Sequence, residues 1–190
     1  MTASRHTSIP ALLLLGIGVL AVALTAPVVF AQGAPTAASL DAILKDVARY
    51  DGGVDSGALW KLRDYVNAHK DDPAGRAECE AKLLAFLKSS ATPVAKMAAG
   101  RSLRLIAGDT AAPALQALLA DDRSADIALY ALQGIRSAVA ENALVQAVST
   151  TTGATKIAVI AALGERKAGT AVPALVPLLQ QPAFAAASAT

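Results

Sequence analysis

The chain has 190 residues, of which 54% are hydrophobic and only 4% aromatic, so its apolar content is mostly alanine and aliphatic side chains. This mixture favours helices. The 17 Lys and Arg nearly balance the 15 Asp and Glu, and apart from the adjacent Arg166 and Lys167 the basic residues are separated along the chain. That balance argues against a dedicated nucleic-acid surface, so we expect no nucleic-acid partner.

The N-terminal segment has the pattern of a secretory signal. Arg5 precedes a long apolar run without charge, and small residues follow it up to Ala31. This order predicts a signal peptide over residues 1–31, cleaved after Ala31. Residues 32–36 then form a short disordered lead-in. The rest of the chain is expected to be exported, in the periplasm or secreted.

An uncleaved membrane anchor is the alternative for the same segment. The apolar run over residues 9–30 is long enough to cross a bilayer as a helix. In that case the chain meets the membrane only through this segment. The remaining residues lie outside the cytoplasm in either case.

Residues 37–91 carry helical patterns with loose spacing, which predict degenerate helical hairpins. Asp72 is a candidate N-cap with Pro73 in the first turn behind it, and a Gly-rich turn lies in "YDGGVDSG". Trp60 and Tyr65 lie beside one apolar stripe. The predicted buried stripes are Leu40, Ile43, Leu44 and Val47, then Leu59, Leu62 and Val66, then Leu83, Phe86 and Leu87.

Residues 92–190 contain a repeat. "TAAPALQALLADD" at 110–122 returns as "TAVPALVPLLQQP" at 170–182, and "AENALVQAVST" between them has the same apolar spacing. This spacing of i, i+3, i+4 predicts one buried helix face in each copy. The three faces are Leu115, Leu118 and Leu119, then Leu144, Ala147 and Val148, then Leu175, Leu178 and Leu179. Their steps are 29 and 31 residues.

Each copy follows another helical pattern that repeats with the same two steps. Thr92 and Pro93 begin the first of these helices. The second register consists of Ala99, Ser102, Leu103 and Ile106, then Ala128, Ala131, Leu132 and Ile135, then Val159, Ala162 and Leu163. A period near 30 residues built from antiparallel helix pairs predicts an all-α fold, an α-solenoid of four to five hairpins. The small residues let neighbouring helices approach closely.

At "AAPALQALLADD…ALYALQGI" and "TAVPALVPLLQQP" the chain resembles the HEAT repeat family, in the short bacterial form found in phycobilin lyases. The resemblance covers residues 92–190 well and 36–91 loosely. The exported arrangement also resembles a group of secreted bacterial HEAT proteins, some of which carry a sugar-processing domain. The resemblance implies a binding scaffold, not a catalyst. After "QQPAFAAASAT" the last repeat is incomplete. We therefore expect an apolar edge without a polar cap, which either results from truncation of the chain or is covered by a partner.

The sequence predicts no catalytic, metal or cofactor site. His69 and Cys79 are the only His and Cys beyond the signal, so no zinc spacing or nucleophile–base pair arises. We interpret His69 as complementing a helix C-terminus and Cys79 as a small, partly buried side chain. The acidic pairs Asp71/Asp72 and Asp121/Asp122 fall in turns, where capping is their expected role.

Scattered basic residues are the candidate partner-binding face. If one helix of each pair lines a common surface, several of these side chains face a shared groove; a solvated face is the simpler alternative. The candidates are Arg101, Arg104, Arg123, Arg136 and Lys156, with Arg166 and Lys167 beyond them. Trp60 and Tyr65 are expected to pack between helices, with an exposed aromatic anchor as the alternative.

Three functions remain open from the sequence. The first is an exported, non-catalytic scaffold that binds a protein partner. The second is an accessory module of an extracytoplasmic enzyme system, for example one that handles sugars, with the catalytic domain on another or a longer chain. The third, attachment of a tetrapyrrole as in lyases, rests on the resemblance alone and fits poorly with export and an acid-flanked cysteine.

Overall fold

The computed structural model describes residues 39–180, which lie within one compact unit, residues 37–190. Every regular element in this range is helical, so the described part is all-α, as the composition predicts. The signal peptide, the alternative membrane anchor and the lead-in all fall outside the described residues and stay predictions. The same holds for the last ten residues of the predicted final repeat.

Short connections join the helices. In chain order they are α1 (Leu40–Val47), α2 (Gly57–His69), α3 (Pro73–Leu87), α4 (Pro93–Ile106), α5 (Ala112–Leu118), α6 (Ala125–Leu132), α7 (Ala138–Thr150), α8 (Gly153–Glu165), the 3-10 turn η1 (Gly169–Ala171), α9 (Val172–Leu175) and the 3-10 segment η2 (Val176–Gln180). The predicted N-cap Asp72 is confirmed, because its side chain accepts a hydrogen bond from the N–H group of Gly75. Thr92, predicted to begin the next helix with Pro93, is the N-cap of α4 and accepts from the N–H group of Ala95. Such caps satisfy donors that a helix start leaves unpaired.

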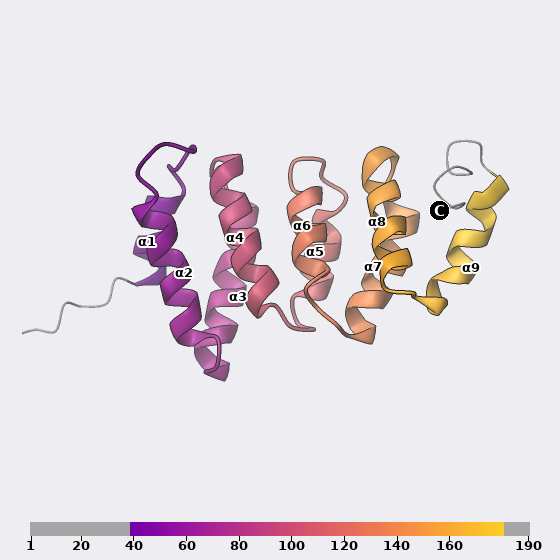
Figure 1. Ribbon diagram of the computed structural model, residues 1–190, viewed down its shortest axis with the longest axis horizontal. Coiled ribbons are helices and arrows are strands. Elements are labelled where there is room, and N and C mark those ends of the chain that lie inside the picture. The colour runs from indigo at the N-terminus through magenta and orange to yellow at the C-terminus, as the bar shows by residue number, and fades with distance from the viewer. Residues whose placement is uncertain (1–38, 181–190) are drawn as a thin grey trace, which may run out of the picture. The chain divides into compact units, whose positions relative to one another are not determined.

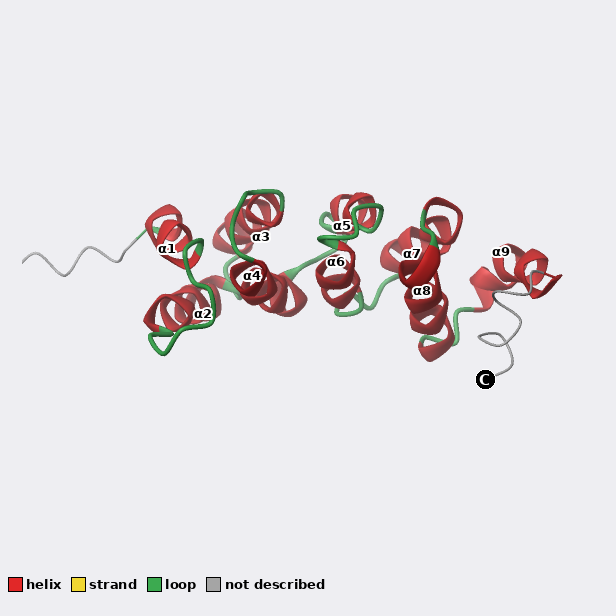
Figure 2. Ribbon diagram, turned by 90° about the horizontal axis from the view of Figure 1, so that it is seen from above, coloured by secondary structure: helices red, strands yellow, loops and turns green. Residues whose placement is uncertain are grey.

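The helices lie in two layers (Figures 1 and 2). Odd-numbered helices form one layer and the helices α2, α4, α6 and α8 form the other. Across the layers, α1 packs on α2, α3 on α4, α5 on α6, and α7 on α8. Within the second layer, α2 contacts α4, α4 contacts α6 and α6 contacts α8. Most contacts therefore join elements that are close in the chain.

The core lies between the layers, and each helix from α1 to α8 contributes a fully buried leucine. These leucines are Leu40, Leu62, Leu83, Leu103, Leu115, Leu132, Leu144 and Leu163. All of them lie on the faces that the apolar spacing predicts. The small residues Ala99, Ala128, Ala131 and Ala162 are also buried, which brings the helices together closely.

Hydrogen bonds between polar side chains connect α3, α5 and α7 to the next helix of their layer, or to the turn before it, at nearly constant separation in the sequence. The Thr110 hydroxyl donates to Oε1 of Glu80 at 2.5 Å, 30 residues earlier. The Gln116 amide donates to Gln146 at 3.1 Å, again 30 residues apart. The Thr170 hydroxyl donates to Glu141, 29 residues earlier. The spacing of these bonds matches the steps of the apolar repeat.

The third copy of the repeat departs from the prediction of one continuous helix. Around Pro173 the chain forms only a four-residue α-helix, and a 3-10 segment containing Pro177 follows it. Proline lacks the N–H that an α-helix needs and its ring crowds the preceding turn, so the second proline ends the α-helix. The predicted buried face is only partly covered here: Leu175 is half-buried, and Leu179 is 53% exposed.

Candidate functional site

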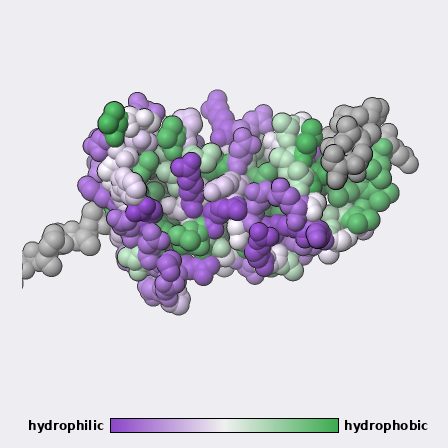
Figure 3. All heavy atoms as spheres, viewed as in Figure 1, coloured by the Kyte–Doolittle hydropathy of each residue, from purple (hydrophilic) through white to green (hydrophobic). Residues whose placement is uncertain are grey.

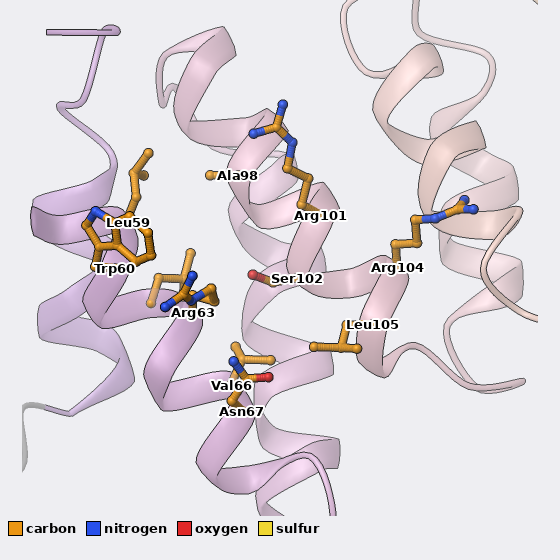
Figure 4. Close-up of a pocket in the computed structure, with 11 residues that line it drawn as sticks. Leu59, Trp60, Arg63, Val66, Asn67, Ala98, Arg101, Ser102, Arg104 and Leu105 are labelled. Atoms are coloured by element: carbon orange, nitrogen blue, oxygen red, sulfur yellow. The ribbon is translucent and has the colours of Figure 1, made fainter. Parts of the chain in front are cut away.

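A groove of about 600 Å³ runs between α2 and α4 on the second layer (Figure 4). Eleven residues line it: Leu59, Trp60, Leu62, Arg63, Val66 and Asn67 from α2, and Ala98, Arg101, Ser102, Arg104 and Leu105 from α4. Leu62 and Val66 are buried, and the other nine residues are at least partly exposed. We call this hollow the α2–α4 groove.

Aliphatic side chains form the floor of the α2–α4 groove. Leu62 and Val66 are buried, while Leu59 is half-buried beside them. Leu105 is 58% exposed although it is a large apolar residue on a helix. In Figure 3 a small apolar area lies among hydrophilic side chains in the region of these two helices. Of these floor residues, water therefore reaches mainly Leu105 and part of Leu59.

Trp60 lies at the edge of the groove and is 53% exposed. Its indole N–H donates to the Ser56 hydroxyl at 3.0 Å, and the Arg63 guanidinium lies 4.1 Å from the ring centre. The expectation that Trp60 packs between helices is therefore wrong, because the helical stripe of Leu62 and Val66 fills the interface without it. Tyr65 is half-buried and stacks on His69 with ring centres 4.2 Å apart.

The charged lining of the α2–α4 groove is entirely basic. Arg63, Arg101 and Arg104 line it, and no carboxylate does. Arg63 approaches Asp64 at 3.4 Å, but both side chains are largely exposed, and such pairs contribute little. The helix α4 carries three basic residues and no acidic one. The groove therefore favours anionic groups.

Arg104 also connects the groove to the next helix. Its guanidinium donates to the backbone carbonyl oxygen of Tyr130 in α6 at 2.7 Å. The same guanidinium lies 4.6 Å from the centre of the Tyr130 ring. In Figure 4 the side chain of Arg104 points toward α6, whereas that of Arg101 points along α4 past Ala98. Arg104 thus holds two helices together, while Arg101 stands beside the apolar floor.

The structure brings together only part of the predicted basic face. Of the five candidates, Arg101 and Arg104 line the α2–α4 groove. Arg123 lies in the turn before α6, Arg136 lies in the connection before α7, and Lys156 lies on α8. None of these three lines the groove.

Two further basic residues, Arg166 and Arg63, have positions and contacts that the sequence did not predict. Arg166, at the end of α8, donates to the Leu132 carbonyl oxygen at 2.7 Å. Burial lowers the pKa of Arg166, and the positive charge of Arg136 lowers it further. Arg63 lines the groove but was not among the candidates. Its spacing of three residues from Trp60, which places both on one helix face, was the available signal.

Most of the Cys, His and Asp residues that were considered as candidates for catalysis or metal binding are buried, hydrogen-bonded or used as helix caps. Cys79 is fully buried in α3, and burial raises the pKa of its thiol, as does the nearby Glu78 carboxylate. His69 ends α2, and its Nδ1 lies 2.7 Å from the Tyr65 carbonyl oxygen. Asp72 caps α3, and Asp121 accepts from the Arg123 backbone N–H. Within residues 39–180, no group of His, Cys, Asp or Glu is arranged to hold a metal ion.

Comparisons with models of protein families, with curated proteins and with solved structures give no match. Among the helices of the described part, none has the length and apolar character required to cross a membrane. The candidate site is therefore defined by the geometry of this chain itself. Its features are an apolar floor, an exposed indole and three guanidinium groups in one groove.

Proposed function

We propose that this chain is an exported, non-catalytic α-solenoid of antiparallel, HEAT-like helix pairs that binds a protein partner. The repeated apolar spacing, the two layers of helices and the hydrogen bonds at separations of 29 and 30 residues support the solenoid. A helix pair of this size cannot bury its own apolar face, so neighbours stack to do so. Such stacking leaves one layer available as a binding surface.

The observation that carries the binding function is the exposure of Trp60 and Leu105 in the same groove. Tryptophan and arginine are the residues most enriched at energetically important positions of protein interfaces. Here an indole, an exposed leucine and three arginines line one hollow of about 600 Å³. This composition matches the centre of a protein interface.

The polar lining of the groove favours binding over catalysis. It consists of guanidinium groups with the Asn67 amide and the Ser102 hydroxyl. Arginine stays protonated, and neither an amide nor an isolated hydroxyl exchanges protons readily near neutral pH. General acid–base catalysis needs a group that does.

Affinity capture with matched variants tests this function. The tagged full-length chain is expressed in its source, captured after mild crosslinking, and compared with Leu105→Gln in the groove and Val94→Gln outside it. Both residues are exposed and on α4, so both changes leave stability nearly unaltered. We expect Leu105→Gln to lose the captured protein and Val94→Gln to retain it. Equal capture by all three proteins would contradict the assignment to this groove.

A further inference from the structure

We infer that the α2–α4 groove binds an acidic amphipathic helix of its protein partner, with apolar side chains on the groove floor and carboxylates at the arginines. This inference rests on the proposed function and adds the chemistry of the partner. The observations that carry it are the charge of the lining, the length of the apolar floor and the scarcity of groups that bind an extended backbone.

Charge complementarity selects an acidic partner. All three charged side chains of the lining are arginines, contributed by both walls: Arg63 from α2, and Arg101 and Arg104 from α4. Guanidinium groups bind carboxylates through paired hydrogen bonds, and the pairing is strong where water is excluded. Within residues 39–180 the Arg101 guanidinium makes no hydrogen bond or ion pair, so its donors are available to a partner.

The apolar floor sets the size of the bound segment. On α2 it extends from Leu59 to Val66, and on α4 from Ala98 to Leu105. At a rise of about 1.5 Å per residue, each wall is about 10 Å long, or two helical turns. A bound helix of two to three turns that presents apolar residues at i, i+3, i+4 and i+7 matches this length.

The polar groups of the groove favour a helix over an extended peptide. Apart from the arginines, only Asn67 and Ser102 offer polar side-chain atoms along the lining. An extended backbone placed on this floor would leave N–H and C=O groups without partners, which is costly when they are removed from water. A helix satisfies those groups internally and presents only its side chains.

Nucleic acid fits the same groove less well. Its phosphates need a series of basic side chains along the strand, and affinity grows with the number of phosphates neutralised. The groove offers three arginines above an aliphatic floor, and Leu62, Val66 and Leu105 give no contact to phosphate. We therefore favour the acidic helix, and an oligonucleotide serves as a competing probe.

Trp60 allows a direct test, because it is the only tryptophan of the chain and lies in the groove. The full-length protein is titrated with a synthetic peptide of about 14 residues, helical and with leucines at i, i+3, i+4 and i+7 flanked by glutamates, while tryptophan emission is recorded. The control peptide has lysine in place of every glutamate. We expect the acidic peptide to bind at least about tenfold more tightly, with affinity falling as salt rises.

Variants that reverse the charge of one groove residue provide the second part of the test. Arg63→Glu and Arg101→Glu are each expected to weaken the acidic peptide by about tenfold and to strengthen the lysine peptide. Lys45→Glu, on the exposed surface of α1, is the matched control and should change neither. Circular dichroism and thermal midpoints establish that all variants fold alike. Unchanged binding of both peptides by Arg101→Glu would overturn the inference.

The remaining outcomes separate this inference from the proposed function. If both peptides bind equally and Leu105→Gln weakens both, the groove is an apolar docking site, the acidic partner is wrong, and the proposed function stands. If neither peptide changes the Trp60 emission, or a single-stranded oligonucleotide binds more tightly than the acidic peptide, the inference is overturned. The captured partner of the Leu105→Gln experiment tests the proposed function independently of the peptides.

Discussion

Gly100 of α4 lies directly against Ile127 of α6. A Cβ atom at position 100 would stand 2.3 Å from Cγ2 of Ile127, far inside van der Waals contact. Both residues are buried, and α4 and α6 are in extensive contact. The absence of a side chain at Gly100 therefore sets the spacing of these two helices, and with it the position of the wall that carries Arg101 and Leu105.

Replacing this glycine should destabilise the protein. Gly100→Ala forces Ile127 to shift, and a β-branched side chain in a helix has little freedom to do so. We expect a loss of about 1–3 kcal/mol in the free energy of unfolding, measured by chemical denaturation.

Gly164→Ala is the matched control. Gly164 also lies in a helix, but nothing stands within 4 Å of the Cβ position. Alanine favours helices over glycine, so this change should stabilise by about 0.5–1 kcal/mol. Equal effects at the two positions would contradict the close approach of α4 and α6.

Glu80 is a second buried determinant of stability. Its carboxylate accepts the Gly108 backbone N–H at 2.8 Å and the Thr110 hydroxyl at 2.5 Å, and so connects α3 to the segment before α5. Glu80→Ala leaves these donors without a partner, and we expect a cost of about 1–3 kcal/mol. Glu78→Ala, two residues away and exposed, removes only a surface ion pair with Lys82 and should cost at most about 1 kcal/mol. Thermal or denaturant unfolding of both variants distinguishes the two roles.

Two leucines at the same position of the repeat should differ in their importance. Leu144 is fully buried in α7, whereas its counterpart Leu175 is only half-buried in α9. We expect Leu144→Ala to cost about 2–5 kcal/mol because it leaves a cavity. Leu175→Ala should cost clearly less. Unfolding midpoints of the two variants, measured under the same conditions, compare the two losses of stability. Similar losses would mean that α9 is as well packed as α7.

Alkaline pH should weaken the fold partly through Cys79. Burial, followed by Glu78, raises the pKa of this thiol in the folded protein. The folded state therefore holds the proton to higher pH than the unfolded chain. The contribution of Cys79 is complete below the unfolded thiol pKa of about 8.5 and is lost as pH rises above it.

Cys79→Ala removes this contribution and should reduce the loss of stability between about pH 7 and about pH 10. Two other groups act in the same direction at higher pH, above about 10, because burial raises the pKa of Tyr65, and hydrogen bonds to Asp41 and Glu78 raise that of Lys82. Denaturant midpoints of both proteins across this range provide the measurement. Identical pH profiles for the two proteins would show that the thiol does not contribute.

Much of the fold follows from the apolar spacing. The faces around Leu115, Leu144 and Leu163 are buried where the pattern predicts, because a helix with such a stripe has to cover it. The third copy of the repeat was only partly predictable. Its leucines repeat the pattern, but Pro177 interrupts the α-helix and Leu179 stays largely exposed.

The candidate site was less predictable, because a groove depends on which helices are neighbours in space. Arg101 and Arg104 were identified as part of a basic face, yet Arg123 lies elsewhere and Arg63 was missed. Trp60 was assigned to helix packing since large aromatic residues are usually covered. Spacing along one helix places residues on a face, but it does not show which face its neighbour leaves open.

The hydrogen bonds that join different helices through side chains have a consequence for how the protein opens. Within residues 39–180, even the bond from Thr92, the N-cap of α4, to Tyr50, in the connection after α1, spans only 42 residues. Contacts this local close small loops and let order spread from several starting points. Hydrogen exchange should therefore decline gradually from the sparsely covered α9 toward the middle helices, and a protease should trim the chain stepwise from that end while α3 and α4 remain protected.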